Sequence, residues 1–211
     1  MDRVDLFPTT LWMGHLGLDT SMILENVIEW KGGTVLQDNI SKEEGKGNDF
    51  SCDDLFKAIK NNMPIPEGMD LPETYIQYWV NYNRPGDFNR KHHHTDCVVL
   101  SSGVYYLKVP KDSGRFLVHD PRGRTIESMA DSKFYGMYSE LGITPDEDMI
   151  FYFPSWLEHE VEKNESDEVR ISIAFNILSK VEVDRYKDMG NLCNNNAVAT
   201  RMDGRTEVFI S

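Results

Sequence analysis

From about residue 74 onward, hydrophobic and polar residues alternate in short runs that predict β-strands. These runs are rich in valine, isoleucine, tyrosine and phenylalanine, and turn-forming stretches such as RPGDFNR, KDSG and EKNESD separate them. The five runs span residues 75–83, 97–110, 114–120, 149–154 and 168–178. Because no helical pattern alternates with them, they favour an antiparallel sandwich of the jelly-roll type over a parallel βαβ sheet.

Two amphipathic helices are predicted before the first strand. Residues 21–31, with Ser21 as the N-cap, and residues 52–62 each place their apolar side chains on one helical face. Pro64 and Pro66 prevent the second helix from continuing. The N-terminal part is therefore expected to be helical and to pack on one sheet.

We expect one domain over residues 1–211, because this length suits a single hydrophobic core. It divides into a helical part over residues 1–70, a jelly-roll core over 74–178 and a C-terminal extension over 180–211. The extension is polar and rich in asparagine, which favours a flexible segment or an arm in an oligomer. A homodimer is the default expectation for such a protein.

Two irregular stretches are long enough to form a lid over a site. Residues 31–51 are rich in glycine, asparagine and charge, which predicts an exposed loop. Residues 123–148 contain no strong strand or helix pattern. Either stretch is a candidate lid.

The chain is acidic, with a formal net charge of -13 from 35 acidic and 22 basic residues. Such a surface repels phosphate backbones, so nucleic-acid binding is not expected. The three cysteines, Cys52, Cys97 and Cys193, form no CxxC pair and suit reduced thiols in a cytoplasm. No stretch approaches the ~20 apolar residues that span a bilayer, so no membrane association is expected.

The run KHHHTDC holds three of the six histidines in the chain. In an extended segment, His94 and Asp96 project from the same face. His159, in FPSWLEHEV, follows a distant strand and could reach them across a sandwich. Two histidines and one carboxylate form a facial triad for a divalent metal. Isolated histidines such as His15 and His119 are expected only to be solvated or to bond the backbone.

The strand EVRISIAFN places Arg170 and Ser172 on one face. A guanidinium on the inner face of a sandwich needs an anionic partner, because a buried unpaired charge is costly. A dicarboxylate ligand would supply that partner through a bidentate pair, and the serine hydroxyl would add a hydrogen bond. The alternative is a surface arginine paired with Glu168 or Asp167.

The runs WVNYNRPGDFNRKHHHTDCVVLSSGVYYLKVP, FPSWLEHEVEKN and VRISIAFNI resemble the 2OG-Fe(II) oxygenases of marine bacteria and cyanophages. The resemblance covers residues 74–178. It implies a mainly β, cupin-like double-stranded β-helix that uses Fe(II) and the cosubstrate 2-oxoglutarate. His94, Asp96 and His159 would bind the metal, and Arg170 and Ser172 the cosubstrate.

The metal motif departs from the resembled family, which often has His-x-His before the Ser-Gly-Val-Tyr-Tyr strand. Counting back from Gly103 places these two positions on His94 and Asp96, so this chain carries His-x-Asp. His92 shares the same face and is the reserve ligand. His93 is expected to point away.

Two further side chains on flanking strands, Tyr106 and Asn83, are candidate contacts for the cosubstrate carboxylate. The implied reaction converts 2-oxoglutarate and O2 into succinate and carbon dioxide while hydroxylating a small-molecule or peptidyl substrate. The expected location is cytoplasmic, in the host cytoplasm if the gene belongs to a phage.

Two other functions remain open. One is a cupin-type metalloprotein that uses His92, His94 and His159. The glutamate that usually follows the cupin His-x-His is absent from TDCVV, which weighs against it. The other is a noncatalytic sandwich module that keeps only a relic of the metal site.

Overall fold

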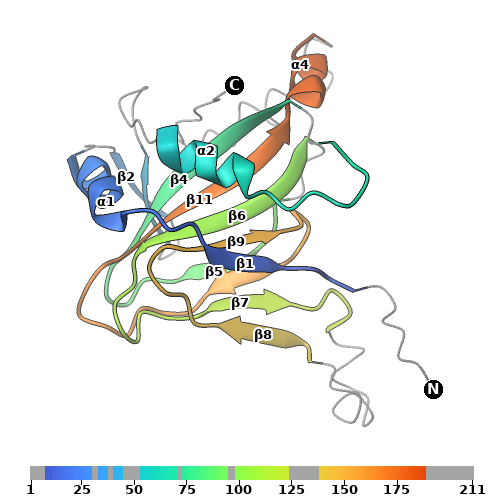
Figure 1. Cartoon of the computed structure of the whole chain (residues 1–211). Helices are drawn as coiled ribbons and strands as arrows, with labels where there is room; N and C mark the ends of the chain where they lie inside the picture. The colour runs from blue at the N-terminus through green and yellow to red at the C-terminus, as the bar shows by residue number, and fades with distance from the viewer. Residues whose placement is uncertain are drawn as a thin grey trace.

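The computed structural model describes residues 8–29, 33–37, 40–44, 53–70, 73–94, 98–123 and 138–188. Its strands form two antiparallel sheets that face each other (Figure 1). The larger sheet has the order β1 (Trp12–His15), β9 (Met149–Phe153), β6 (Val99–Lys108), β11 (Arg170–Ser179), β4 (Thr74–Asn83), β3 (Ile40–Glu44) and β2 (Gly33–Gln37). The smaller sheet has the order β5 (Asn89–His92), β10 (His159–Val161), β7 (Phe116–His119) and β8 (Glu140–Ile143).

The two faces of β11 point to opposite sides of the larger sheet. Ile171, Ile173 and Phe175 belong to a buried cluster on the outer side of the larger sheet. Arg170 and Ser172, at the alternate positions, line a cavity between the sheets. This is the alternation that a strand with two buried faces imposes on its side chains.

Two helices cover the outer side of the larger sheet, α1 (Thr20–Glu29) and α2 (Asp53–Asn61), as Figure 1 shows. Val27 of α1 and Phe56 of α2 are buried against that sheet. Tyr82 of β4 donates a hydrogen bond to the carbonyl oxygen of Val27 at 3.1 Å. The predicted packing of N-terminal helices on one sheet is confirmed.

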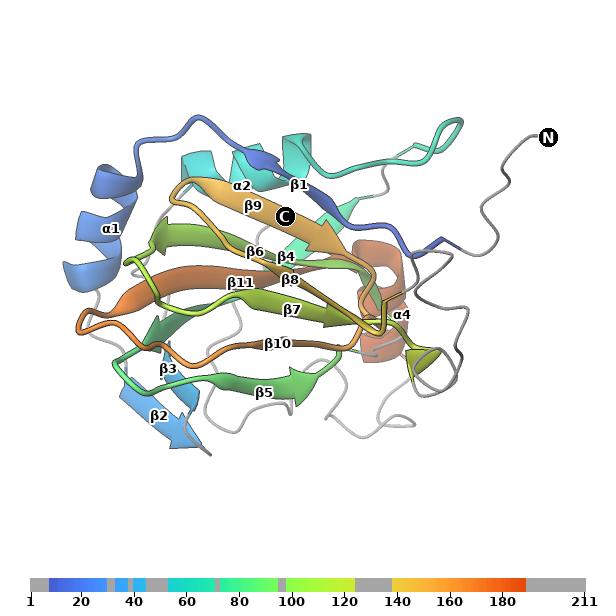
Figure 2. The same ribbon diagram turned by 90° about the horizontal axis from the view of Figure 1, so that it is seen from below.

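The opposite side of the larger sheet packs against the smaller sheet, which Figure 2 shows from below. Val104 and Tyr106 of β6 and Phe153 of β9 meet Phe116 of β7 in this inner core. The five predicted strands correspond to β4, β6, β7, β9 and β11. The fold is mainly β and is a double-stranded β-helix, as predicted.

Two expectations for the N-terminal part differ from the structure. The N-cap of α1 is Asp19, whose Oδ1 accepts a hydrogen bond from the N–H of Ser21 at 3.0 Å. The stretch 31–51, predicted to be a loop, contains the hairpin β2–β3. This hairpin extends the larger sheet because Glu43 pairs with Val80 of β4, and backbone pairing of this kind leaves little sequence signal.

The expected C-terminal extension begins with a packed helix, α4 (Lys180–Asp188). Val183 of α4 is buried against Val98 and Leu178, so this part is joined to the sheet. Residues 189–211 and 124–137 lie outside the described residues, as do all three cysteines. Of the stretch 123–148, the structure shows β8 at the edge of the smaller sheet. Among the described helices, none has the length and apolar character to cross a bilayer.

Candidate metal centre

Three histidines converge between the two sheets. His92 at the end of β5 pairs with His159 at the start of β10. His94 follows β5, and its backbone N–H donates a hydrogen bond to Ser155 O at 2.7 Å. One ring nitrogen from each histidine lies within 4.8 Å of the other two. This spacing suits three ligands of one metal ion, given small adjustments of the rings.

The backbone fixes which nitrogens face the centre. Nδ1 of His92 lies 2.6 Å from Arg90 O, and Nδ1 of His159 lies 2.9 Å from Leu157 O. A carbonyl oxygen only accepts hydrogen bonds, so both Nδ1 atoms carry the proton and both Nε2 lone pairs remain for a metal. This pattern of a backbone-anchored imidazole is typical of metal ligands.

Burial also keeps His159 in the form that binds metals. Burial first, and the nearby His92 second, lower the pKa of His159 from 6.5 to about 3. The rings of Phe153 and Phe116 lie 4.7 and 5.5 Å from the His159 ring. An apolar wall of this kind disfavours the charged imidazolium and leaves the neutral ligand.

The structure brings together two of the three predicted ligands, His94 and His159, and adds the reserve ligand His92. Asp96 lies outside the described residues. His93 is exposed between its two buried or half-buried neighbours, as strand alternation predicts. Among the described residues, the cluster is therefore the all-histidine set that was the alternative ligand set from sequence.

Arg170 is fully buried beside the same cavity, with 1% of its surface exposed. Its Nη1 donates to the carbonyl oxygens of Ser113 at 2.8 Å and Gly114 at 3.2 Å. Its Nη2 donates to Asn83 Oδ1 at 2.9 Å. Nε is buried and has no hydrogen-bond partner among the described residues. The observed acceptors are neutral, so they do not balance the charge, and the guanidinium keeps a donor for an anionic ligand.

The other predicted contacts lie around this guanidinium. Tyr106 and Ser172 are buried register partners on β6 and β11. Burial raises the pKa of Tyr106, although the Arg170 charge opposes this, so the phenol stays protonated and can donate. Asn83 is occupied at both ends, because its Nδ2 also donates to Asn89 Oδ1 at 2.9 Å. It therefore holds the arginine in place.

The three histidines and the guanidinium line one narrow cavity. Its polar walls are formed by His92, His94, His159, Arg170, Ser172, Tyr106, Asn81 and Asn89. A metal bound by the histidines and an anion bound by the arginine would thus share one cavity. Trp79, whose ring lies 5.6 Å from that of His94, closes part of the wall.

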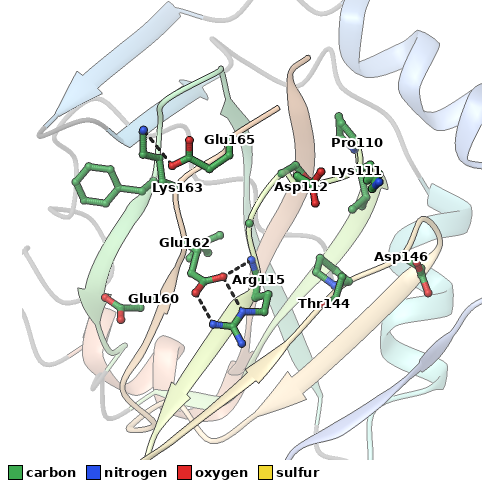
Figure 3. Close-up of a pocket in the computed structure, with 16 residues that line it drawn as sticks. Pro110, Lys111, Asp112, Arg115, Thr144, Asp146, Glu160, Glu162, Lys163 and Glu165 are labelled. Carbon is green, nitrogen blue, oxygen red and sulfur yellow. Dashed lines mark hydrogen bonds and ion pairs between the residues drawn. The ribbon is translucent and has the colours of Figure 1, made fainter. Parts of the chain in front are cut away.

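A second, wider groove of about 1150 Å³ opens on the outside of the protein (Figure 3). Figure 3 shows Arg115 bonded to Glu162, at 2.6 and 2.8 Å, and Lys163 paired with Glu165 at 3.0 Å. These cations are already neutralised by carboxylates. The smaller cavity is the better candidate site, because metal ligands and an unpartnered buried donor meet there.

Residues 77–176 match the profile of a protein family described as "Putative 2OG-Fe(II) oxygenase". The matched segment includes most of β4, the three clustered histidines and most of β11. No match to the chain was found among curated proteins.

Several solved structures share the fold. Prolyl-4-hydroxylase from Pseudomonas putida is 17% identical, with a TM-score of 0.54 over 82% of this chain and 94% of that chain. A prolyl hydroxylase from Trichoplax adhaerens, bound to a fragment of hypoxia inducible factor, is 14% identical, with a TM-score of 0.57 over 83% and 86%. HygX from Streptomyces hygroscopicus, with nickel and 2-oxoglutarate bound, is 10% identical, with a TM-score of 0.55 over 82% and 84%.

Proposed function

Because the chain belongs, through residues 77–176, to the family of 2OG-Fe(II) oxygenases, we propose that it is a dioxygenase that hydroxylates a small-molecule or peptidyl substrate. One observation carries the proposal. Three histidines and a buried arginine with an unpartnered donor line the same cavity between the sheets. This combination suits a metal and a dicarboxylate bound side by side.

We propose that His92, His94 and His159 hold the Fe(II). Their ring nitrogens are close together, and two of the three rings are aligned by backbone carbonyls. Imidazole is a suitable ligand for iron, and three ligands leave further positions for a cosubstrate and O2. The set predicted from sequence, with Asp96 in place of His92, is the competing assignment.

Arg170 would hold the distal carboxylate of 2-oxoglutarate through its Nε edge. The Tyr106 hydroxyl and the Ser172 hydroxyl would add hydrogen bonds from the adjacent strands. Asn83 and the carbonyls of Ser113 and Gly114 fix the plane of the guanidinium from behind. The dicarboxylate would also balance a buried positive charge, which favours its binding.

When bound, Fe(II) and 2-oxoglutarate activate O2 for oxidation of the substrate, with release of succinate and carbon dioxide. The protein side chains orient the cosubstrate and keep water away from the metal. Phe116, Phe153 and Trp79 supply the apolar part of this enclosure. No general base is required, which agrees with the absence of a carboxylate pair among the lining residues described.

The proposed substrate class is an analogy with proteins of the same fold. Structural neighbours include prolyl hydroxylases and HygX, which together suggest a peptidyl or small-molecule substrate. The net charge of -13 disfavours a nucleic acid. The homodimer, the single domain over 1–211 and the cytoplasmic location remain predictions.

The test is an anaerobic titration of the protein with Fe(II) and then 2-oxoglutarate, followed by succinate analysis after O2 is admitted. We expect a weak visible charge-transfer band, and succinate formation that depends on O2. Arg170→Lys should weaken 2-oxoglutarate binding, whereas the matched variant Arg115→Lys should not.

Failure would distinguish the alternatives. Iron binding without a 2-oxoglutarate band would point to the cupin-type metalloprotein. A folded protein that binds no iron would point to the noncatalytic module. Equal effects of Arg170→Lys and Arg115→Lys would overturn the assignment of the cosubstrate site.

A further inference from the structure

A second group of metal-ligating side chains lies on the outer face of the smaller sheet. It consists of His119 at the end of β7, Glu140 at the start of β8 and Glu160 in β10. One ligand atom from each side chain lies within 4.8 Å of the other two. The three strands are neighbours in the sheet, in the order β10, β7 and β8. The cluster is therefore a product of sheet pairing.

Sheet register explains why these residues meet. His119 pairs directly with Glu140, and Glu160 pairs with Leu117, two residues before His119. His159 and Glu160 are consecutive and point to opposite faces. His159 thus turns inward to the first centre, while Glu160 turns outward to His119.

The imidazole of His119 is the enclosed member of the group. Its side chain is only 11% exposed, whereas those of Glu140 and Glu160 are 44% and 31% exposed. Nε2 lies 3.2 Å from a Glu160 oxygen, and Nδ1 lies 3.7 Å from a Glu140 oxygen. Nε2 is buried and makes no well-aligned hydrogen bond to a described residue. A buried Nε2 that faces a Glu160 oxygen without a well-aligned hydrogen bond suits a cation shared by the two side chains.

The local charge also suits a cation. Two carboxylates surround one imidazole, on a chain with a net charge of -13. The nearby cation Arg115 interacts electrostatically with Glu140, but its guanidinium is hydrogen-bonded to Glu162. One imidazole and two carboxylates form a ligand set for a divalent first-row metal, with mixed nitrogen and oxygen ligands.

We propose that His119, Glu140 and Glu160 form a second site for a divalent cation, separate from the site of the proposed oxygenase reaction. A cation there would join β8, β7 and β10 on the side of the sheet opposite the first centre. Because Glu160 follows His159 directly, the cation would also stabilise the strand that carries this histidine. Its role would be structural, since the site lies outside the inner cavity.

The test is a count of Mn²⁺ bound per chain, from the electron paramagnetic resonance signal of the free ion at equilibrium. Mn²⁺ suits the carboxylate ligands of this group, and it is not among the soft metals that thiolates select. We expect two equivalents for the wild type and one for either Glu140→Gln or Glu160→Gln. The matched charge control Glu182→Gln, on α4, should keep both equivalents.

A variant of the first centre, His92→Ala, makes the two proposals distinguishable. If both metal sites exist, His92→Ala loses one equivalent of Mn²⁺. It keeps the other equivalent, which Glu140→Gln removes. If only the second site exists, the wild type binds one equivalent, which Glu140→Gln abolishes and His92→Ala does not. Stoichiometry that is the same in Glu140→Gln, Glu160→Gln and the wild type would overturn the second site. His119 would then be only an ion-paired histidine.

Discussion

Asn83 and Arg170 are register partners on β4 and β11, and Asn83 Oδ1 accepts a hydrogen bond from Arg170 Nη2 at 2.9 Å. The asparagine is itself fixed by a hydrogen bond to Asn89. Asn89 begins β5, the strand that ends at His92. A chain of side-chain contacts thus joins the guanidinium to the strand of a candidate metal ligand.

Asn83→Asp should weaken 2-oxoglutarate binding. A carboxylate at this position would neutralise Arg170 and repel Asn89 Oδ1. The distal carboxylate of the cosubstrate would then bind Arg170 less strongly. A hydrogen bond to a charged group contributes ~1.5–3 kcal/mol, so the Kd should rise about tenfold or more. Anaerobic titration of the iron-loaded protein measures the Kd for 2-oxoglutarate. Asn62→Asp, on an exposed residue, is the control, and an unchanged Kd in Asn83→Asp would refute the positioning role.

His92→Ala and Asp96→Asn separate the two candidate ligand sets. If three histidines hold the metal, His92→Ala should lower the Fe(II) content by one equivalent per chain, whereas Asp96→Asn should leave the content unchanged. The exposed His93→Ala is the matched control. Metal content after anaerobic dialysis provides the measurement. The reverse pattern, with binding lost in Asp96→Asn, would restore the assignment made from sequence.

Tyr106→Phe should raise the Kd for 2-oxoglutarate without a comparable loss of stability. The phenol lies in the inner cavity near Arg170, and its loss removes one hydrogen bond, which corresponds to a few-fold up to about tenfold change. Tyr105→Phe is a matched control on the other face of β6, where its hydroxyl donates to Asp148 at 2.9 Å. If both variants bind 2-oxoglutarate equally, Tyr106 is only a packing residue.

Gly103→Ala should destabilise the fold. A Cβ at this position would overlap the ring of Phe175 and the backbone oxygen of Phe151. Overpacking of this kind costs about 1–3 kcal/mol, which urea unfolding can measure. Gly14→Ala, where an added Cβ meets nothing within 4 Å, should be nearly neutral. Equal stability of the two variants would contradict the packing described for β6.

The metal-free protein should lose stability as the pH falls below about 6.5. The pKa of His159 is about 3 in the folded chain, against an ordinary 6.5. Between these values the unfolded chain binds more protons at this residue, so the free energy of unfolding decreases on acidification, by up to ~1.4 kcal/mol per pH unit. Urea unfolding in the presence of a chelator measures the slope. His159→Gln should reduce it, whereas the exposed His15→Gln should not, and equal slopes would exclude His159 as the source.

Much of the architecture could be read from local pattern. The strands β4, β6, β9 and β11 are long or strongly apolar, so alternation alone predicted them and placed Arg170 and Ser172 on one face. The strands β5, β8 and β10 span only three or four residues each. Such short strands carry little periodicity and depend on partners that are distant in sequence.

The sequence by itself determined the jelly-roll, the shared face of Arg170 and Ser172 and the two motifs that contain His94 and His159, because alternation and residue chemistry are local properties. Only the tertiary structure decided that His92 joins these histidines, that Asn83 holds Arg170, and that His119 meets Glu140 and Glu160. Each of these contacts depends on the register between strands far apart in the chain. Register depends on which faces of the paired strands are buried and on the turns that join them. The pattern of a single short strand does not reveal its partner.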